Sequence, residues 1–278
     1  MTGDRWSSWL LHRRDGGAPP SPQLHTFRDG VLARAAIQPG DVVLDVGAGT
    51  GLIGFGALDL VGPTGRVIFS DVSEALLAEC RRQAGDDPRC SFVCAPAEDL
   101  GDLPDASVDV VTTRSVLMYV ADRERALGEL ARVLRPGGRL SVFEPVNSFG
   151  GERTRFLGYD CAPVLHLVAK VLSAYDADAR ITDFDERDLL RWAAGAGFTA
   201  LEMDYRAEVD VPAPALPGPW ERLRETAPNP LAPTYREAME ATLTPAEREH
   251  LEAYLGDLVS SGAERRSTSA TVHLRGIR

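Results

Sequence analysis

A carboxylate followed by closely spaced glycines is the feature of this sequence best suited to chemistry. A short apolar run ends in Asp45 and continues into Gly47, Gly49 and Gly51. Glycine tolerates positive φ angles and lets a ligand approach the backbone, so this spacing predicts a ligand-binding loop that opens a helix. Gly49 to Gly54 also fits the G-x-G-x-x-G spacing of dinucleotide-binding loops, which is weak evidence when it stands alone.

The charge of Asp45 bears on the choice of ligand. A pyrophosphate at the N-terminus of the following helix would be repelled by this carboxylate, whereas an ammonium and a sulfonium would be attracted. The sequence therefore favours S-adenosylmethionine over a dinucleotide. Asp71 closes the next apolar run and is placed to accept hydrogen bonds from ribose hydroxyls, a device that NAD enzymes share. Asp71 thus supports an adenosine ligand without choosing the cofactor.

Five short apolar segments are expected to form the strands that position these carboxylates. Several are continuous apolar runs, which suits parallel strands buried on both faces. Helical stretches capped by Ser73 and Asp122 lie between them, and this alternation is typical of a doubly wound α/β fold. The predicted strands are Val42–Val46, Arg66–Ser70, Ser91–Ala95, Val108–Thr113 and Arg139–Glu144, with turns at 62–65 and 135–138.

The second half of the chain has a different pattern. Apolar and polar residues alternate from Leu201 to Val209 and again from Ala270 to Arg275. This pattern predicts two strands, each with one solvent-exposed face, at an antiparallel edge of the sheet. A capping box at Thr244 predicts a helix from Pro245 to about Val259. Two insertions, 147–180 and 211–266, separate these elements from the core, and one elaborated domain fits better than two.

Composition excludes several classes of function. The 278 residues carry a net charge of −11, which disfavours nucleic acid and anionic lipid as partners. No apolar run is long enough for a membrane span. The four cysteines are too few and too irregularly spaced for a disulfide framework or a zinc site, so we expect no metal and a reduced, cytoplasmic protein. The expected partner is a small molecule, and the oligomeric state, monomer or homodimer, stays open.

Jointly, these motifs resemble the class I S-adenosylmethionine-dependent methyltransferases. The likeness is greatest to the ubiquinone/menaquinone-biosynthesis group, which acts mainly on small molecules, and it covers about 24–146 well. It implies a Rossmann-like, seven-stranded sheet with an antiparallel C-terminal edge hairpin and helical cap insertions. It also implies S-adenosylmethionine as the cofactor. The motifs that carry it are Asp45–Gly51, Asp71, Ala97–Leu100 and Leu134–Gly138.

The resemblance also implies an organisation and a cofactor site. We expect one methyltransferase domain over 1–278, with N-terminal lid helices in 1–40, a cofactor-binding core in 41–146, and the remaining core in 181–210 and 267–278. The methionine part of the cofactor is expected on the glycine loop, the ribose at Asp71 and the adenine near Ala97 and Glu98. The expected cofactor residues are Asp45, Gly47, Ala48, Gly49, Gly51, Asp71, Val72, Ala97, Glu98 and Arg114.

The sequence departs from the family at two places. Pro96 stands where relatives often have Asp, which puts the adenine hydrogen bond in question. The segment 114–119 stands where relatives often carry a His pair.

Methyl transfer needs alignment above all, and for most acceptors also a general base. The candidates near the strand ends are Arg114, Tyr119 and Glu144, and His25 lies in a segment that covers the cofactor in relatives. Each has a plainer interpretation, since His25 fits an ordinary surface histidine and Tyr119 an ordinary packing aromatic. Our catalytic candidates are His25, Tyr119 and Arg114.

These observations predict a methyltransferase that moves a methyl group to O, N or C of a small, largely apolar acceptor, with secondary metabolism as the expected setting. One alternative is a methyltransferase-like protein that binds the cofactor but catalyses cyclisation or serves as a binding partner. A second is an NAD-dependent oxidoreductase, which rests on the glycine spacing. A third, methylation of protein or RNA, is disfavoured for RNA by the acidic balance.

Overall fold

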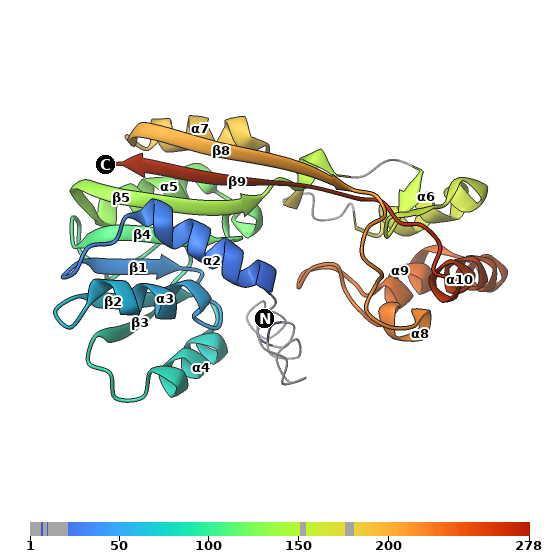
Figure 1. Cartoon of the computed structure of the whole chain (residues 1–278), viewed down its shortest axis with the longest axis horizontal. Coiled ribbons are helices and arrows are strands. Elements are labelled where there is room, and N and C mark those ends of the chain that lie inside the picture. The colour runs from blue at the N-terminus through green and yellow to red at the C-terminus, as the bar shows by residue number, and fades with distance from the viewer. Residues whose placement is uncertain (1–6, 8–9, 11–21, 151–153, 176–180) are drawn as a thin grey trace. The chain divides into compact units, whose positions relative to one another are not determined.

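The chain is organised as two compact units in a computed structural model that describes residues 7, 10, 22–150, 154–175 and 181–278 (Figure 1). Unit 1 comprises 1–146, 184–206 and 271–278, and unit 2 comprises 147–183 and 207–270. The two insertions that the sequence predicts fall in unit 2. Of the predicted lid segment, 1–40, the structure describes Ser7, Leu10, helix α2 (Pro22–Ala35) and the residues after it, and the other positions lie outside the described residues.

Unit 1 is built on a seven-stranded sheet in the order β3-β2-β1-β4-β5-β9-β8. The strands from β3 to β5 pair in parallel, whereas β9 runs antiparallel to β5. The predicted Rossmann-like sheet with its antiparallel C-terminal edge is thereby confirmed. The strands are β1 (Val42–Val46), β2 (Arg66–Asp71), β3 (Cys90–Cys94), β4 (Val108–Arg114), β5 (Leu134–Pro145), β8 (Thr199–Asp210) and β9 (Ser267–Ile277).

The register of the central strands gathers functional residues at one edge. Val46 pairs with Ser70 on one side and with Thr113 on the other. Three neighbouring strands therefore end at the same level, and the residues that follow these positions emerge together. Those residues are Gly47, Asp71 and Arg114.

Two helices of unit 1, those capped by Ser73 and Asp122, begin where the sequence predicts. The Ser73 hydroxyl accepts a hydrogen bond from the Leu76 amide at 3.3 Å, and the Asp122 carboxylate accepts one from the Arg125 amide at 3.0 Å. No helix in the described part of the chain is long and apolar enough to cross a bilayer. Besides α2, the helices are α3 (Leu52–Val61), α4 (Glu74–Ala84), α5 (Arg123–Val133), α7 (Glu186–Gly195) and the 3₁₀ turn η1 (Leu117–Tyr119).

The turn predicted at 135–138 is wrong, because these residues lie inside strand β5. Between the pairs Val108–Leu134 and Val110–Arg139, β5 advances five residues while β4 advances two, which makes a large bulge. The bulged backbone pairs with the distant Arg278, whose carbonyl accepts from the Gly137 amide at 2.9 Å. Pro and Gly therefore mark a bulge rather than a turn.

The edge strand β8 is present, but its predicted buried face is only partly formed. Leu201 and Met203 are half-buried, whereas Tyr205 and Val209 are 38% and 57% exposed. Val209 lies in the part of β8 that belongs to unit 2, whereas Tyr205 is exposed although it still belongs to unit 1. Alternation along the sequence indicates a strand but not how much of it is covered.

Unit 2 has its own apolar core, formed by side chains from its helices and its small hairpin. Buried Leu167, Trp220, Met239 and Leu251 belong to this core. The capping box at Thr244 is confirmed and starts helix α10. The elements are η2 (Asn147–Phe149), β6 (Arg155–Phe156), β7 (Tyr159–Asp160), η3 (Ala162–Val164), α6 (Leu165–Ser173), α8 (Trp220–Leu223), α9 (Tyr235–Thr242) and α10 (Pro245–Ser260).

Candidate functional site

The glycine loop between β1 and α3 has the backbone that its sequence predicts. Gly47, Gly49 and Gly51 have φ angles of 67°, 56° and 84°, a region that side chains disfavour. A Cβ at Gly47 would lie 2.2 Å from Val116 Cγ2, so the chain itself requires this glycine. Among the described residues, the atom nearest to a Cβ at Gly49 would be Leu10 Cδ1 at 3.8 Å, so these residues leave room for a ligand at this backbone.

Asp45 lies beneath this loop and is only 1% exposed. One carboxylate oxygen accepts from the amide of Gly54 at 2.9 Å, and the other accepts from the hydroxyl of Thr112 at 3.0 Å. Asp45 thus satisfies an amide in the first turn of α3, which would otherwise lack a partner. Burial raises its pKa to about 7, against the lowering effect of these hydrogen bonds and of the Arg114 charge.

Asp71 joins the end of β2 to the glycine loop. Its Oδ2 accepts from the Gly49 amide at 2.8 Å, and its Oδ1 accepts from the Ser73 amide at 2.9 Å. Burial raises its pKa above the ordinary value. The next residue, Val72, is 52% exposed, so an apolar surface lies directly beside this carboxylate.

The loop after β3 is tied to the segment that precedes α5. The Glu98 carboxylate accepts from the Ala121 amide at 3.1 Å, and its backbone carbonyl accepts from Arg125 Nε at 2.9 Å. Ala97 is 6% exposed. One oxygen of Glu98 is therefore engaged within the protein, and the adenine contact predicted for this residue stays a prediction.

Glu144 holds the turn that follows β4. It is 0% exposed, and its Oε1 accepts from the amides of Val116 and Leu117 at 2.8 and 2.9 Å, while Oε2 accepts from Met118 at 3.3 Å. Burial raises its pKa to about 7, opposed by these bonds and by the Arg114 charge. The arrangement makes Glu144 a cap of η1 rather than an exposed base.

The catalytic candidates lie in unit 1, in different settings. Arg114 ends β4, is half-buried, and has a pKa lowered by burial against the raising effect of Glu144 and Asp45. Tyr119, also half-buried, closes η1 directly after it. His25 lies in the first turn of α2, which begins on the side of the sheet toward which β1 points (Figure 1). A catalytic role for these residues remains a prediction.

Three contributors were missed by sequence reasoning because their partners are distant in the chain. Thr112 fixes Asp45, Val116 packs over Gly47, and the side chain of Leu10 lies beside Gly49. No short-range signal marks these contacts, since each depends on the pairing of strands or the packing of a loop.

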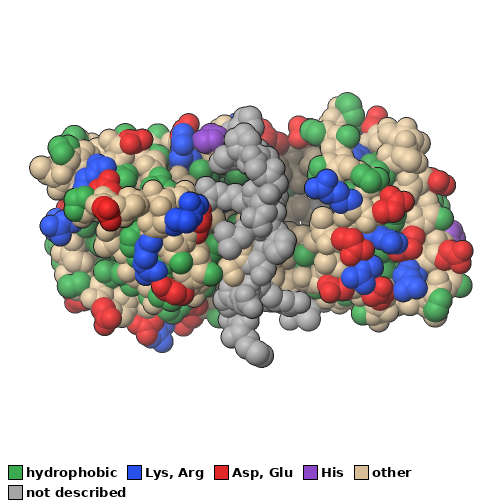
Figure 2. All heavy atoms as spheres, turned by 90° about the horizontal axis from the view of Figure 1, so that it is seen from below, with side chains coloured by type: hydrophobic (Ala, Val, Ile, Leu, Met, Phe, Trp, Pro, Cys, Tyr) green, Lys and Arg blue, Asp and Glu red, His purple; other side chains and the backbone are tan. Residues whose placement is uncertain are grey.

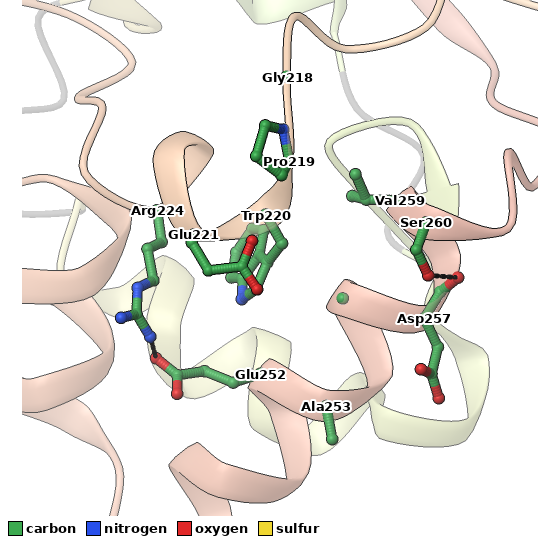
Figure 3. A pocket seen from close by; sticks show the side chains of 11 residues that line it. Gly218, Pro219, Trp220, Glu221, Arg224, Glu252, Ala253, Asp257, Val259 and Ser260 are labelled. Atoms are coloured by element: carbon green, nitrogen blue, oxygen red, sulfur yellow. Dashed lines mark hydrogen bonds and ion pairs between the residues drawn. The ribbon is translucent and has the colours of Figure 1, made fainter.

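A separate hollow of about 590 Å³ lies in unit 2 between α8 and α10 (Figure 3). Trp220 and Glu221 line it from α8, and the Arg224–Glu252 ion pair, 2.9 Å long, closes one end. Its lining residues all belong to unit 2, so it is distinct from the strand ends of unit 1.

The charged side chains of the described surface are mixed in sign. Figure 2 shows acidic and basic residues interspersed on the face drawn, and many form short ion pairs, such as Arg236–Glu240 at 3.0 Å. On the face drawn, the described residues form no continuous basic patch.

Comparisons with known proteins define the class. Residues 44–142 match the family described as "Methyltransferase domain". The chain is similar to the ubiquinone/menaquinone biosynthesis C-methyltransferase UbiE of Hahella chejuensis, with 36% identity over 151 residues, which are 52% of this chain and 60% of that protein. The chain thus spans less than two thirds of that relative's length.

Solved structures show the same fold. YcgJ of Bacillus subtilis aligns with a TM-score of 0.56 and 18% identity, over 91% of this chain and 98% of its own. The [4+2]-cyclase SpnF aligns with a TM-score of 0.50 and 21% identity, over 91% and 80%. Residues 44–142 thus match a methyltransferase domain, and the chain is similar to C-methyltransferases of ubiquinone/menaquinone biosynthesis.

Proposed function

We propose that this chain binds S-adenosylmethionine at the carboxyl ends of β1, β2 and β4 and transfers its methyl group to a small organic acceptor. The observation that carries the proposal is that two amides of the glycine loop and the following helix are already hydrogen-bonded within the protein. The amides of Gly49 and Gly54, which a pyrophosphate would use, already donate to Asp71 and Asp45. An anionic dinucleotide would meet two carboxylates there, whereas a cationic ligand would be attracted.

The residues present fit this cofactor. The accessible backbone at Gly49 offers a cradle for the methionine part, Asp71 offers an acceptor for ribose, and exposed Val72 offers an apolar face for adenine. Ala48, Ala97, Glu98 and Arg114 complete the proposed site. The bound cofactor supplies an activated methyl on a sulfonium, so the protein mainly has to align the acceptor and exclude water.

We assign acceptor binding to unit 2. An aromatic and aliphatic core, which includes Phe156, Tyr175 and Tyr235, supports a largely apolar acceptor such as a secondary metabolite. Where the acceptor must lose a proton, Tyr119 and His25 are the candidate bases. None of the four cysteines, all of which are described, forms a disulfide, which supports a reducing compartment such as the cytoplasm.

Calorimetric titration tests the cofactor assignment. We expect S-adenosylhomocysteine to bind, and NAD not to bind under the same conditions; the reverse result would overturn the proposal. Because a cyclase shares the fold, the reaction needs its own test. Incubation of the protein with S-adenosylmethionine and mixed small acceptors should give products heavier by one methylene in mass spectrometry, and turnover without that gain would contradict methyl transfer.

A further inference from the structure

Ionisable side chains form a row along the carboxyl ends of three neighbouring strands. Asp45 lies at the end of β1, Arg114 at the end of β4 and Glu144 near the end of β5, and the sheet order places β4 between the other two. Asp45 and Glu144 are 1% and 0% exposed. The Arg114 charge acts on each of the two carboxylates.

Acidic groups outnumber basic groups in the row and its surroundings. Asp71, at the end of β2, adds a third carboxylate that acts on Asp45, and Tyr119 from η1 is neutral at ordinary pH. Arg114 stays protonated in proteins. When the carboxylates are ionised, three negative charges face one positive charge. Because these groups are buried, dissolved salt screens them much less than it screens surface charges.

We infer that this row shifts the binding preference of the site towards cationic ligands, and that Glu144 is a residue whose charge sets this preference. The inference rests on the proposed cofactor site. During transfer the methyl group bonds to the acceptor, the electron pair of the carbon–sulfur bond stays on sulfur, and the acceptor releases its proton. S-adenosylmethionine, with its sulfonium, thereby becomes the neutral thioether S-adenosylhomocysteine. The row would hold the substrate form and favour release of the product.

Glu144 is the residue best suited to test this charge preference, because it does not bond to the glycine loop. Its carboxylate contacts the turn after β4 through the amides of Val116 and Met118, whereas Asp45 and Asp71 are bonded to the glycine loop and α3 themselves. Glu144→Gln removes one charge with little change of shape and keeps an oxygen for the two shortest hydrogen bonds.

The matched control is Val116→Ala. It removes methyl groups that pack over Gly47 without changing any charge. A purely structural role for Glu144 predicts that both variants weaken neutral and cationic ligands alike. An electrostatic role predicts that only Glu144→Gln changes the ratio between them.

Calorimetry at pH 8 with S-adenosylhomocysteine, S-adenosylmethionine and sinefungin, which carries an ammonium in place of the sulfonium, distinguishes these roles. We expect Glu144→Gln to weaken the two cationic ligands by about tenfold, the effect of one charge within about 10 Å at a dielectric constant of about 20, and to leave the neutral ligand within about twofold. An unchanged ratio would overturn the inference. Failure of the unaltered protein to bind any of the three would overturn the proposed function as well.

A second measurement does not depend on the variant folding. In the unaltered protein, the preference for sinefungin over S-adenosylhomocysteine should fall between pH 8 and pH 6, as Asp45 and Glu144 take up protons. Arg114 keeps its charge over this range. A preference that is independent of pH would contradict the inference.

Discussion

The Asp71 carboxylate accepts a hydrogen bond of 2.8 Å from the amide of Gly49. One side chain at the end of β2 therefore sets the conformation of the glycine loop that follows β1, and also lies beside the exposed Val72. The ribose site and the methionine site proposed for the cofactor are thus coupled before any ligand binds.

Asp71→Asn should weaken binding of S-adenosylhomocysteine by about tenfold or more. An amide in this place offers only one oxygen, and its NH₂ group would face one of two backbone donors. Titration calorimetry measures the loss, and exposed Asp102→Asn is a control of equal charge change. Equal affinity in the two variants would remove Asp71 from the cofactor site.

Gly47→Ala should destabilise the protein by about 2 to 4 kcal/mol, the sum of a left-handed alanine and an overpacked contact with Val116. Gly85→Ala is the control, because Gly85 also has a positive φ, 58°, but a Cβ there meets nothing within 4 Å. Gly85→Ala should lower the free energy of unfolding by only about 1 kcal/mol. Urea unfolding gives both values. Equal losses would show that the contact with Val116 is not tight.

Stability should fall as pH rises from about 5 to 8. Asp45 and Glu144 have pKa values of about 7 in the folded chain, above their usual 3.8 and 4.5. The unfolded chain releases both protons near pH 4 while the folded chain holds them until about pH 7, so rising pH favours unfolding. Urea unfolding at pH 5 and pH 8 measures the difference. In Glu144→Gln the slope should be shallower, and an identical slope would contradict the raised pKa.

Leu251→Ala should damage unit 2 without affecting the cofactor. Leu251 is 0% exposed in the core of unit 2, so its truncation should cost about 2 to 5 kcal/mol. Hydrogen exchange should accelerate within 147–183 and 207–270, while affinity for S-adenosylhomocysteine stays within about twofold and methyl transfer falls. Leu189→Ala, in helix α7 of unit 1, is the matched control. A large loss of cofactor affinity in Leu251→Ala would contradict the assignment of unit 2 to the acceptor.

The sequence was sufficient for the central strands and the helix starts because their signals are local. Val42–Val46 is apolar except for Asp45, and Ser73 caps the helix that begins at the next residue. The bulge in β5 was not predictable, because Gly137 bonds to Arg278, far along the chain. Its Pro and Gly signals are the same ones that mark turns.

The position of the site could be predicted from the sequence, but the hydrogen bonds among its residues could not. Asp45 and Asp71 could be located from strand ends and glycine spacing. That Asp45 bonds to Thr112, and Glu144 to the turn after β4, depends on strand pairing across 67 and 26 to 28 residues. Buried carboxylates of this kind appear in a sequence only as acids in an apolar run, and their partners come from tertiary structure.

The sheet order has a consequence for how the chain is made. Strand β9 lies between β5 and β8 although it follows both of them in the sequence. Until β9 has been synthesised, β8 has no neighbouring strand to pair with. Residues 147–183 likewise cannot complete the core of unit 2 until residues 207–270 have been made. Domains generally fold as units during synthesis. Here the sheet edge closes only after β9 has been made, so until then a ribosome-bound chain carries an unpaired, partly apolar strand.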